Sequence, residues 1–241
     1  MSIPKIIHYC WFGGKEKPDN VKKCIESWKR VLSDYQIIEW NENNFDINKL
    51  RYTKEAYEAK KYAFVSDVAR VHALLNYGGI YMDTDVEVLK SFDSILNSRC
   101  VLGIEEGDYV ATSMIAAEKK HPLIVEFADI YTKLSFYDSK GKIIPGTNVQ
   151  KLTDMLKKLG YVQKNIYQEL NEEICIYPKE YFSPYDYINC YFNITEKTIC
   201  VHHFFVSWMP WQTRAKKVIK RKLVKIIGVN GMNYLRERLK K

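Results

Sequence analysis

Short continuous runs of apolar residues alternate along the chain with segments in which apolar residues recur at helical spacing. The runs at 4–12 and 35–42 are rich in Ile, Tyr and Trp, and such runs are typical of strands that are covered on both faces. Between them, behind Asp19 as the expected N-cap, four apolar residues share one helical face: Val21, Ile25, Trp28 and Leu32. A strand, a helix and a strand in succession predict an α/β fold.

The same pattern predicts elements up to about residue 208. The segment before Gly78 and Gly79 carries apolar residues at helical spacing, and the two glycines are the expected C-terminal stop of that helix. Further strands are expected at 78–89, 100–106, 109–118 and 198–208, further helices at 122–134 and 148–159, and loops at 41–53 and 135–147.

Two carboxylates interrupt the apolar strand expected at 78–89. Asp83 and Asp85 are two residues apart, and in an extended segment such residues point to the same side. Two hard oxygen ligands at one spot suit Mg²⁺ or Mn²⁺, which bridges protein carboxylates to the phosphates of a ligand. Because an Asp-x-Asp triplet also arises by chance in a chain of this length, the triplet alone does not decide the function.

A second charged pair lies on the preceding helix. Asp67 and Arg70 are three residues apart and therefore share a helix face. Most such pairs are solvated surface contacts, but the residues around this one are apolar almost all round the helix. We therefore expect the pair to be partly buried, and a buried charged pair needs a reason beyond stability.

Other signals narrow the class of protein. No G-x-G-x-x-G follows the first strand and no G-x-x-x-x-G-K-S/T occurs, which argues against a dinucleotide dehydrogenase and a P-loop NTPase. We expect neither a signal peptide nor a transmembrane helix, because the first residues lack a basic region and no apolar run approaches 18 residues. The six cysteines have neither paired nor zinc-site spacing, and we expect them to be reduced and buried.

The formal charge is concentrated at the C-terminus. From Arg214 to Lys241 there are 11 Lys and Arg and one acid, so of the total of +8 this segment carries +10 and residues 1–213 carry −2. Its apolar residues recur at helical spacing: Val218, Ile219, Leu223, Ile226 and Ile227. A basic amphipathic helix favours the surface of an anionic membrane. Nucleic acid is disfavoured as a partner, because the segment lacks aromatics interleaved with the basic residues, and a solvated helical extension is a further alternative.

Three stretches of the sequence resemble glycosyltransferase family 32, a group that contains bacterial capsule and surface-polysaccharide sugar transferases. KKYAFVSDVARVHALLNYGGIYMDTDVEVLK resembles its sugar-binding region with a D-x-D motif, IPKIIHYCWFGG its opening block and VHHFFVSW its late block, in the expected order. The resemblance implies a GT-A type fold, a Rossmann-like mixed sheet flanked by helices, over residues 1–213, with the basic tail at 214–241. It also implies a nucleotide-sugar donor, with a UDP-sugar favoured, a divalent metal, and retention of anomeric configuration.

The resemblance also assigns donor-binding roles to individual residues. Trp11, at the end of the first strand, would stack on the base of the donor. Asp67 would accept hydrogen bonds from sugar hydroxyls, and Arg70 would bridge the sugar and the phosphate. Ser207 and Trp208 would donate hydrogen bonds to the β-phosphate as the leaving group departs.

The metal site implied by the resemblance combines the D-x-D motif with a late histidine. Asp83 and Asp85 would supply two ligands, and catalysis would depend on them together with the Asp67 and Arg70 pair. We favour His202 as the third ligand and keep His203 as the alternative, because adjacent strand residues point to opposite faces.

These observations lead to a hypothesis for the function. We expect a metal-dependent retaining glycosyltransferase that moves a sugar from a nucleotide sugar to a saccharide acceptor, expected to be lipid-linked, in surface-polysaccharide synthesis. Its expected location is cytoplasmic, peripheral at the inner face of the membrane. Since no carboxylate is an obvious nucleophile, we favour front-side attack, with the departing phosphate as the proton acceptor. Glu105, Glu106 and Asp108 could act on the acceptor hydroxyl, although carboxylates beside a turn usually belong to the surface.

Two other classes of function use the same residues. A metal-dependent phosphotransferase or nuclease could bind its metal with the two aspartates, and nucleotide-sugar hydrolysis without phosphodiester cleavage would exclude it. A non-enzymatic membrane-surface binding module would keep the aspartates only for structure, and we would then expect no metal-dependent affinity for nucleotides.

Overall fold

Helices and strands alternate along the computed structural model, which describes residues 3–186 and 191–205 and scattered positions between 220 and 238. Within residues 3–186 the α-helices are α1 (Asp19–Val31), α2 (Arg51–Glu58), α3 (Tyr62–Tyr77), α4 (Pro122–Thr132), α5 (Asn148–Lys158) and α6 (Lys179–Phe182). Short 3₁₀ turns lie at η1 (Ile47–Lys49), η2 (Asp93–Ile95) and η3 (Glu106–Asp108). The strands are β1 (Ile6–Cys10), β2 (Gln36–Trp40), β3 (Gly79–Met82), β4 (Val86–Val88), β5 (Cys100–Ile104), β6 (Val110–Ala117), β7 (Gln168–Leu170), β8 (Ile174–Tyr177), β9 (Tyr185–Asp186), β10 (Tyr191–Phe192) and β11 (Cys200–His202).

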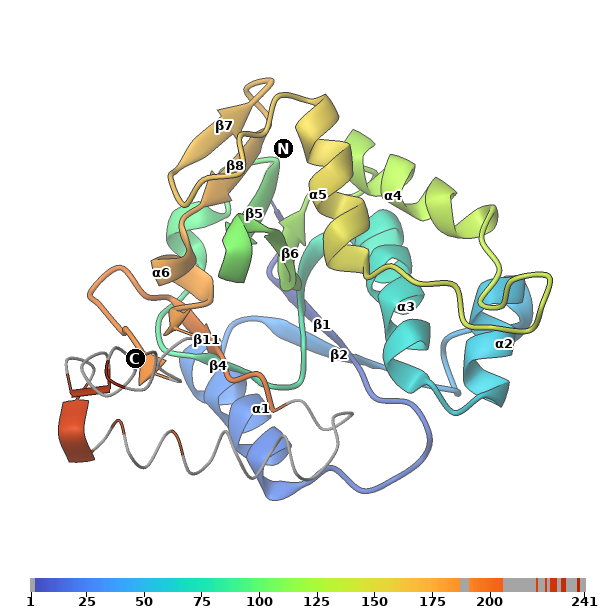
Figure 1. Cartoon of the computed structure of the whole chain (residues 1–241), viewed down its shortest axis with the longest axis horizontal. Helices are drawn as coiled ribbons and strands as arrows, with labels where there is room; N and C mark the ends of the chain where they lie inside the picture. Colours follow the sequence, from blue (N-terminus) through green and yellow to red (C-terminus); the bar gives the residue numbers. More distant parts are fainter. Residues whose placement is uncertain are drawn as a thin grey trace.

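A seven-stranded sheet runs through the molecule in the order β2-β1-β3-β6-β5-β8-β7 (Figure 1). β1 is parallel to β2 and β3, whereas β6 is antiparallel to its two neighbours, β3 and β5. β1, β3 and β5 therefore run in one direction and end at the same edge of the sheet, which we call the carboxyl edge. Trp11, Asp83 and Glu105 follow these three strands. In open α/β sheets this is the edge at which ligands bind.

Both faces of the sheet are buried. Helices α2 to α5 cover one face, and α1, α6 and the small β4-β11 sheet cover the other. Successive residues of β6 divide between the two cores, since Ile115 packs with α3 and α4 whereas Met114 packs with α1 and β4. Burial on both faces explains why the strands read as continuous apolar runs. The predicted α/β fold with a mixed central sheet between helices is confirmed.

Two glycines connect α3 to the sheet, as the sequence predicts. Gly78 and Gly79 have φ of +67° and +101°, which L side chains rarely adopt. A Cβ atom on Gly78 would lie 2.6 Å from the backbone nitrogen of Lys119, and one on Gly79 would lie 2.5 Å from the carbonyl oxygen of Ile6. Only glycine lets α3 stop here and β3 enter between β1 and β6.

The expectation of one strand over 78–89 is wrong. β3 ends at Met82 and β4 begins at Val86, so Asp83 and Asp85 lie in a turn rather than in an extended segment. The turn forms because the Val86 N–H donates to the Asp83 carbonyl at 3.0 Å, while the Asp83 N–H donates to the Ser113 carbonyl at 2.8 Å. The turn, and not the period of a strand, directs the two carboxylates.

Two smaller expectations are also corrected. Pro18 occupies the N-cap of α1, and Asp19 is the first helical residue, where its charge still favours the helix dipole. The loop expected at 41–53 contains η1 and the start of α2, which the sequence pattern did not indicate. The loop at 135–147 and the helices that flank it agree with expectation to within two residues.

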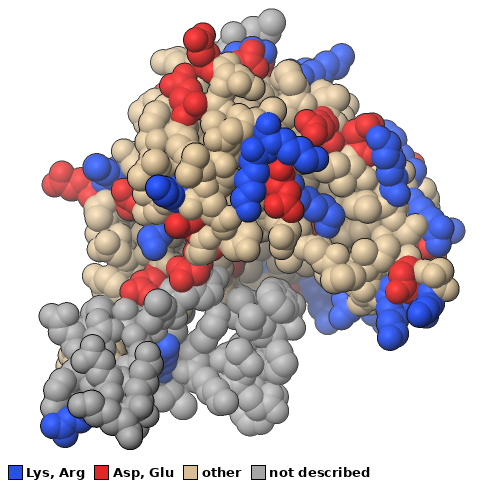
Figure 2. All heavy atoms as spheres, turned by 45° about the horizontal axis from the view of Figure 1, so that its top comes forward, with Lys and Arg blue, Asp and Glu red and all other residues tan. Residues whose placement is uncertain are grey.

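Charged side chains on the described surface are mixed in sign. Figure 2 shows Lys and Arg interspersed with Asp and Glu over this face, in agreement with the near-neutral charge of residues 1–213. Most of the basic tail at 214–241 lies outside the described residues. Among the helices that are described, none has the length and apolar character needed to cross a membrane.

Candidate active site

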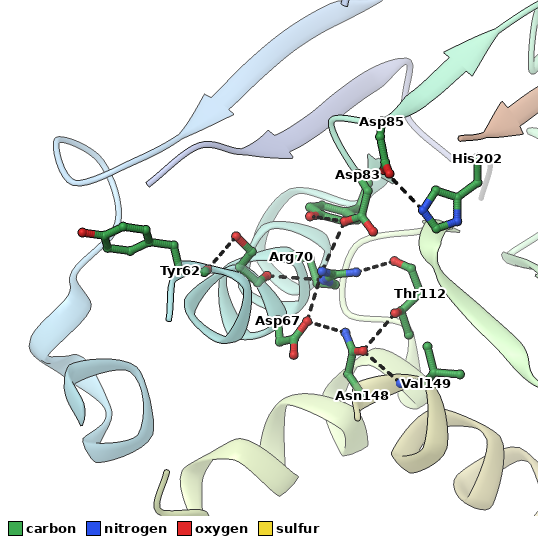
Figure 3. A network of polar contacts seen from close by, with 11 residues as sticks. Tyr62, Asp67, Arg70, Asp83, Asp85, Thr112, Asn148, Val149 and His202 are labelled. Atoms are coloured by element: carbon green, nitrogen blue, oxygen red, sulfur yellow. Dashed lines mark hydrogen bonds and ion pairs between the residues drawn. The ribbon is translucent and has the colours of Figure 1, made fainter. Parts of the chain in front are cut away.

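Three potential metal ligands converge at the carboxyl edge. Asp83 and Asp85 lie in the turn after β3, and the last residue of β11, His202, faces them (Figure 3). The antiparallel pairing of β11 with β4 places His202 opposite Val86, directly beside the turn. One ligand atom from each of the three side chains lies within 4.8 Å of the others, and Nε2 of His202 is 3.2 Å from Oδ1 of Asp85.

Asp85 also holds the chain that follows β11. Its Oδ2 accepts a hydrogen bond from the Phe205 N–H at 3.0 Å, and its carbonyl accepts one from the His203 N–H at 2.9 Å. The two segments that carry the potential ligands are therefore tied to each other through backbone groups. Such ties hold ligands in place before any metal binds.

Arg70, on α3, contacts two carboxylates: Asp67, which is predicted to bind the sugar, and Asp83, which is predicted to bind the metal. Its Nη2 lies 3.1 Å from Oδ1 of Asp67 and 3.2 Å from Oδ1 of Asp83, and its Nη1 donates to the Thr112 carbonyl at 2.5 Å. The guanidinium stacks over the ring of Tyr81, 4.5 Å from its centroid, and the Tyr81 hydroxyl donates to Asp83 at 2.8 Å. The Arg70 side chain is only 6% exposed. The prediction that Asp67 and Arg70 form a partly buried pair is confirmed.

Asn148, the first residue of α5, completes the network around Asp67. Its Nδ2 donates to Oδ1 of Asp67 at 2.6 Å, and its Oδ1 accepts from the Thr112 hydroxyl at 3.0 Å and from the Val149 N–H at 2.9 Å (Figure 3). α3, β6 and α5 thus meet at one polar cluster. A ligand hydroxyl that reached Asp67 would find a carboxylate whose orientation is already set.

Burial and charge shift the pKa values of the site in opposite directions. Burial raises the pKa of Asp67 to about 6, against the attraction of Arg70 and with a further rise from Asp83. Burial lowers the pKa of His202, but the neighbouring Asp85 carboxylate outweighs it and raises the pKa overall. In the same way burial raises the pKa of Asp85, and the charge and hydrogen bond of His202 bring it below its ordinary value. Carboxylates outnumber cations here, so the site favours an additional positive charge.

Trp11 lies at the carboxyl edge but outside this network. It follows β1, its indole N–H donates to the Lys15 carbonyl at 2.6 Å, and Lys17 Nζ lies 5.7 Å from the centroid of its ring. The N–H is therefore used within the loop, and a stacking role would need the ring face.

The structure separates the two candidate histidines. Nε2 of His203 lies 2.8 Å from Oε2 of Glu87, and His203 is not part of the converging group, to which His202 belongs. β11 ends at His202, so His203 follows the strand and the alternation of strand residues does not apply to it. Ser207 and Trp208 lie outside the described residues.

Three residues of the network were not identified from the sequence. Tyr81 had a usable signal, because it lies two residues before Asp83 in a strand. Thr112 and Asn148 had none, since each reaches the cluster only through the packing of β6 and α5 against α3.

The residues present fit a divalent cation. Two carboxylates provide the oxygen ligands that Mg²⁺ and Mn²⁺ prefer, and a neutral imidazole is a suitable third ligand for Mn²⁺. Asp67 and Asp83 share the single positive charge of Arg70, and the negative charge that remains favours binding of a cation.

Comparisons with known proteins agree with this site. Residues 18–102 match the family model described as the glycosyltransferase sugar-binding region containing the DXD motif, which spans Asp67, Arg70, Asp83 and Asp85. The chain is 25% identical over 143 residues to inositol phosphoceramide mannosyltransferase 3 of Schizosaccharomyces pombe, covering 56% of this chain and 39% of that protein. It is 29% identical over 162 residues to lactosylceramide 4-alpha-galactosyltransferase of Mus musculus, covering 67% of this chain and 42% of that protein.

The chain thus spans about two fifths of the length of these curated relatives. Among solved structures, the galactosyltransferase LgtC in complex with donor and acceptor sugar analogs aligns with 91% of this chain and 95% of its own, at a TM-score of 0.47 and 12% identity. The matched family model and both relatives describe glycosyltransferases, and the mixed sheet between helices is the GT-A type architecture that the sequence resemblance implies.

Proposed function

We propose that the protein is a metal-dependent glycosyltransferase that transfers a sugar from a nucleotide sugar, with a UDP-sugar favoured, to a saccharide acceptor with retention of configuration. One observation carries the proposal. The Arg70 guanidinium lies within 3.2 Å of both Asp67 and Asp83, so a set of groups suited to a sugar and a set suited to a metal and a diphosphate share one cation. A nucleotide sugar presents these two chemistries side by side.

The residues of the chain bind and orient the donor. Asp67, oriented by Asn148, accepts hydrogen bonds from sugar hydroxyls, and Arg70 directs its remaining N–H donor to the sugar and phosphate. Asp83, Asp85 and His202 would hold a divalent cation, which would supply Lewis-acid stabilisation of the charge that develops on the diphosphate leaving group.

Three further residues keep the roles that the family resemblance implies. Trp11 stacks on the base of the donor, and its place at the end of β1 on the carboxyl edge supports this. Ser207 and Trp208 donate to the β-phosphate, which is a proposal from the sequence alone.

We further propose a lipid-linked acceptor at the inner face of the membrane, as in surface-polysaccharide synthesis. Two observations support it. The names of the two curated relatives, an inositol phosphoceramide mannosyltransferase and a lactosylceramide galactosyltransferase, both describe lipid-borne acceptors. The tail at 214–241 carries a net charge of +10, which suits an anionic membrane surface, whereas residues 1–213 are nearly neutral.

A thermal-shift screen tests the proposed activity. UDP- and GDP-hexoses are added to the full-length protein, each with and without Mn²⁺, because a ligand that binds the native state raises its midpoint. We expect a shift that needs both the metal and one nucleotide class, followed by metal-dependent release of free sugar from that donor. A protein that is folded, shows no shift with any pair and cleaves a phosphodiester instead would reject the transferase in favour of a phosphotransferase or nuclease.

Deletion of residues 214–241 tests the membrane proposal separately. We expect the full chain to sediment with vesicles that contain an anionic lipid, and the truncated chain to stay in the supernatant while retaining hydrolysis of the donor. Equal sedimentation of the two proteins would contradict the proposed role of the tail.

A further inference from the structure

Glu105 occupies a position at the carboxyl edge equivalent to that of Asp83. β5 ends one residue before Glu105, as β3 ends one residue before Asp83, and the two strands run in the same direction with β6 between them. Strands that have one strand between them are about 10 Å apart. Glu105 therefore lies within reach of a substrate that extends along the edge from Asp83.

The backbone of Glu105 directs its side chain toward the face of the sheet that carries the metal-ligand group. Its φ of −122° and ψ of −167° continue the extended conformation of β5. In β5, Val101 packs in the core shared with α1 and β4, and a Cβ atom on Gly103 would meet Phe182 of α6 in that core. Glu105 is the next residue with this orientation, and the face it shares also holds β11, which ends in His202.

The Glu105 carboxylate has no evident structural task. It stands at the N-cap of η3 but makes no capping hydrogen bond, and within residues 3–186 and 191–205 no hydrogen bond or ion pair of its side chain is found. It is partly buried, and that burial raises its pKa. A partly buried carboxylate without a partner is costly to stability, so a role toward a ligand is the better explanation.

The surroundings of Glu105 are those of the site itself. Four charged groups act on its carboxylate, namely His202, Asp83, Arg70 and Asp85. It does not belong to the group whose ligand atoms lie within 4.8 Å of one another. Glu105 thus lies close enough to be influenced by these charges, yet outside the converging ligand group.

We propose that Glu105 is a catalytic residue of the acceptor side, which orients the acceptor hydroxyl and takes its proton, in place of the departing phosphate that the sequence led us to expect as the proton acceptor. The inference rests on the proposed function. In the transfer step the acceptor oxygen forms a bond to the anomeric carbon, the bond from that carbon to the diphosphate oxygen breaks with its electron pair on the diphosphate, and the hydroxyl proton passes to a carboxylate oxygen of Glu105. Trp11 and Asp83 follow β1 and β3, and Glu105 follows β5, across β6 from them.

The test compares Glu105→Gln with Glu106→Gln in the full-length protein. The donor is the UDP- or GDP-hexose that gives the largest Mn²⁺-dependent thermal shift, and water serves as the acceptor. We expect Glu105→Gln to lower kcat by on the order of 10²-fold, as loss of a general base does, with KM for the donor and the affinity for Mn²⁺ each within about twofold of wild type. Glu106→Gln, the neighbouring carboxylate on η3, is expected to keep kcat within about twofold.

A second variant gives a readout that a structural role would not move. Glu105→Ala leaves space for a small carboxylate, and we expect added formate to restore part of its kcat while leaving wild type and Glu106→Gln unchanged. A Glu105→Gln enzyme with more than half of the wild-type kcat would overturn the inference, and so would a loss of Mn²⁺ affinity or of donor KM that accounts for the whole defect. A wild-type protein that transfers sugar neither to a saccharide acceptor nor to water would reject the proposed function, and the inference with it. An active Glu105→Gln variant of an active enzyme would reject the inference alone.

Discussion

Two clusters of charged residues lie at opposite edges of the central sheet, and they differ in how much negative charge remains uncompensated. At the edge where β5 begins, Arg99 forms ion pairs with Glu118 and Glu173. At the carboxyl edge, Arg70 pairs with Asp67 and Asp83. Each cluster therefore contains one arginine and two acids.

Exposure distinguishes the two arginines. The Arg99 side chain is 39% exposed and that of Arg70 only 6%. Ion pairs in water contribute little to stability, and buried ones often contribute less than a well-packed apolar group would. The Arg99 cluster links β5, β6 and β8 at the surface, and this structural role accounts for its charges. The buried Arg70 cluster, next to Asp85 and Glu105, retains negative charge that a ligand can use.

The comparison is tested most strongly at the aspartates of the turn. We expect the double variant Asp83→Asn with Asp85→Asn to lose on the order of 10³-fold in metal-dependent donor hydrolysis, because several kcal/mol of leaving-group stabilisation disappear and each 1.4 kcal/mol is a factor of about ten. The matched control at the other edge is Glu118→Gln with Glu173→Gln, which we expect to keep activity within about threefold. Hydrolysis rates at saturating Mn²⁺ decide, and equal losses in both double variants would remove the distinction between the edges.

Arginine to lysine substitutions at the two edges come next in expected effect. Lysine keeps the charge but not the planar fork that lets Arg70 contact Asp67, Asp83 and the Thr112 carbonyl at once. We expect Arg70→Lys to lower kcat/KM for the donor by about 10²-fold and the free energy of unfolding by about 2 kcal/mol. For Arg99→Lys we expect less than about 1 kcal/mol and no change in activity. Urea unfolding and initial rates provide both numbers, and similar losses for the two variants would contradict the expectation.

His202 and His203, at the end of β11, provide a comparison with a smaller expected effect. His202→Ala removes a proposed ligand, and we expect the affinity for Mn²⁺ to fall at least about tenfold, which is the lower end for lost metal-site groups. His203→Ala removes the contact with Glu87 and ring contacts with Phe192 and Phe205, and we expect it to leave Mn²⁺ binding unchanged. Calorimetric titration of Mn²⁺ into each variant measures this, and a defect in His203→Ala instead would exchange the roles of the two residues.

The sequence predicts local features well and the assembly of the site poorly. Helix α3, its glycine stop and the partial burial of Asp67 and Arg70 follow from apolar spacing within one segment. The turn that holds Asp83 and Asp85 does not, because one of its two hydrogen bonds is made to Ser113, on a strand thirty residues away. Short-range patterns carry no information about such a partner.

The same limit applies to the residues that complete the network. Asn148 begins α5 and reads as an ordinary helix start, yet its amide group joins Asp67 to Thr112. Glu105 reads as a surface carboxylate beside a turn, and only the direction of β5 relative to β3 brings it to the site. Strand direction in a mixed sheet is a property of the whole fold.

Substitution of the buried carboxylate of Asp67 is expected to have the smallest effect and, unlike the other substitutions, to increase stability. Its pKa in the folded protein is raised to about 6 from 3.8, mainly by burial. Because the pKa is raised, protonation of Asp67 stabilises the fold fully below pH 3.8, and this stabilisation is lost as the pH rises through 6. The loss in the free energy of unfolding has a ceiling of roughly 3 kcal/mol. Above pH 6 the fold therefore keeps a charge at Asp67 that it would be more stable without.

Asp67→Asn tests whether that charge serves the ligand. We expect the variant to be more stable than wild type by about 1 kcal/mol at pH 7.5, below the ceiling because the amide cannot replace the ion pair with Arg70, and to show no gain at pH 4. Activity is expected to fall at least about tenfold, because a sugar hydroxyl loses its charged acceptor. Urea unfolding at the two pH values measures the gain, with the exposed Asp129→Asn as a control expected to change by less than about 0.5 kcal/mol at either pH. A variant that is both less stable at pH 7.5 and fully active would mean that Asp67 is a structural partner of Arg70, like the glutamates around Arg99.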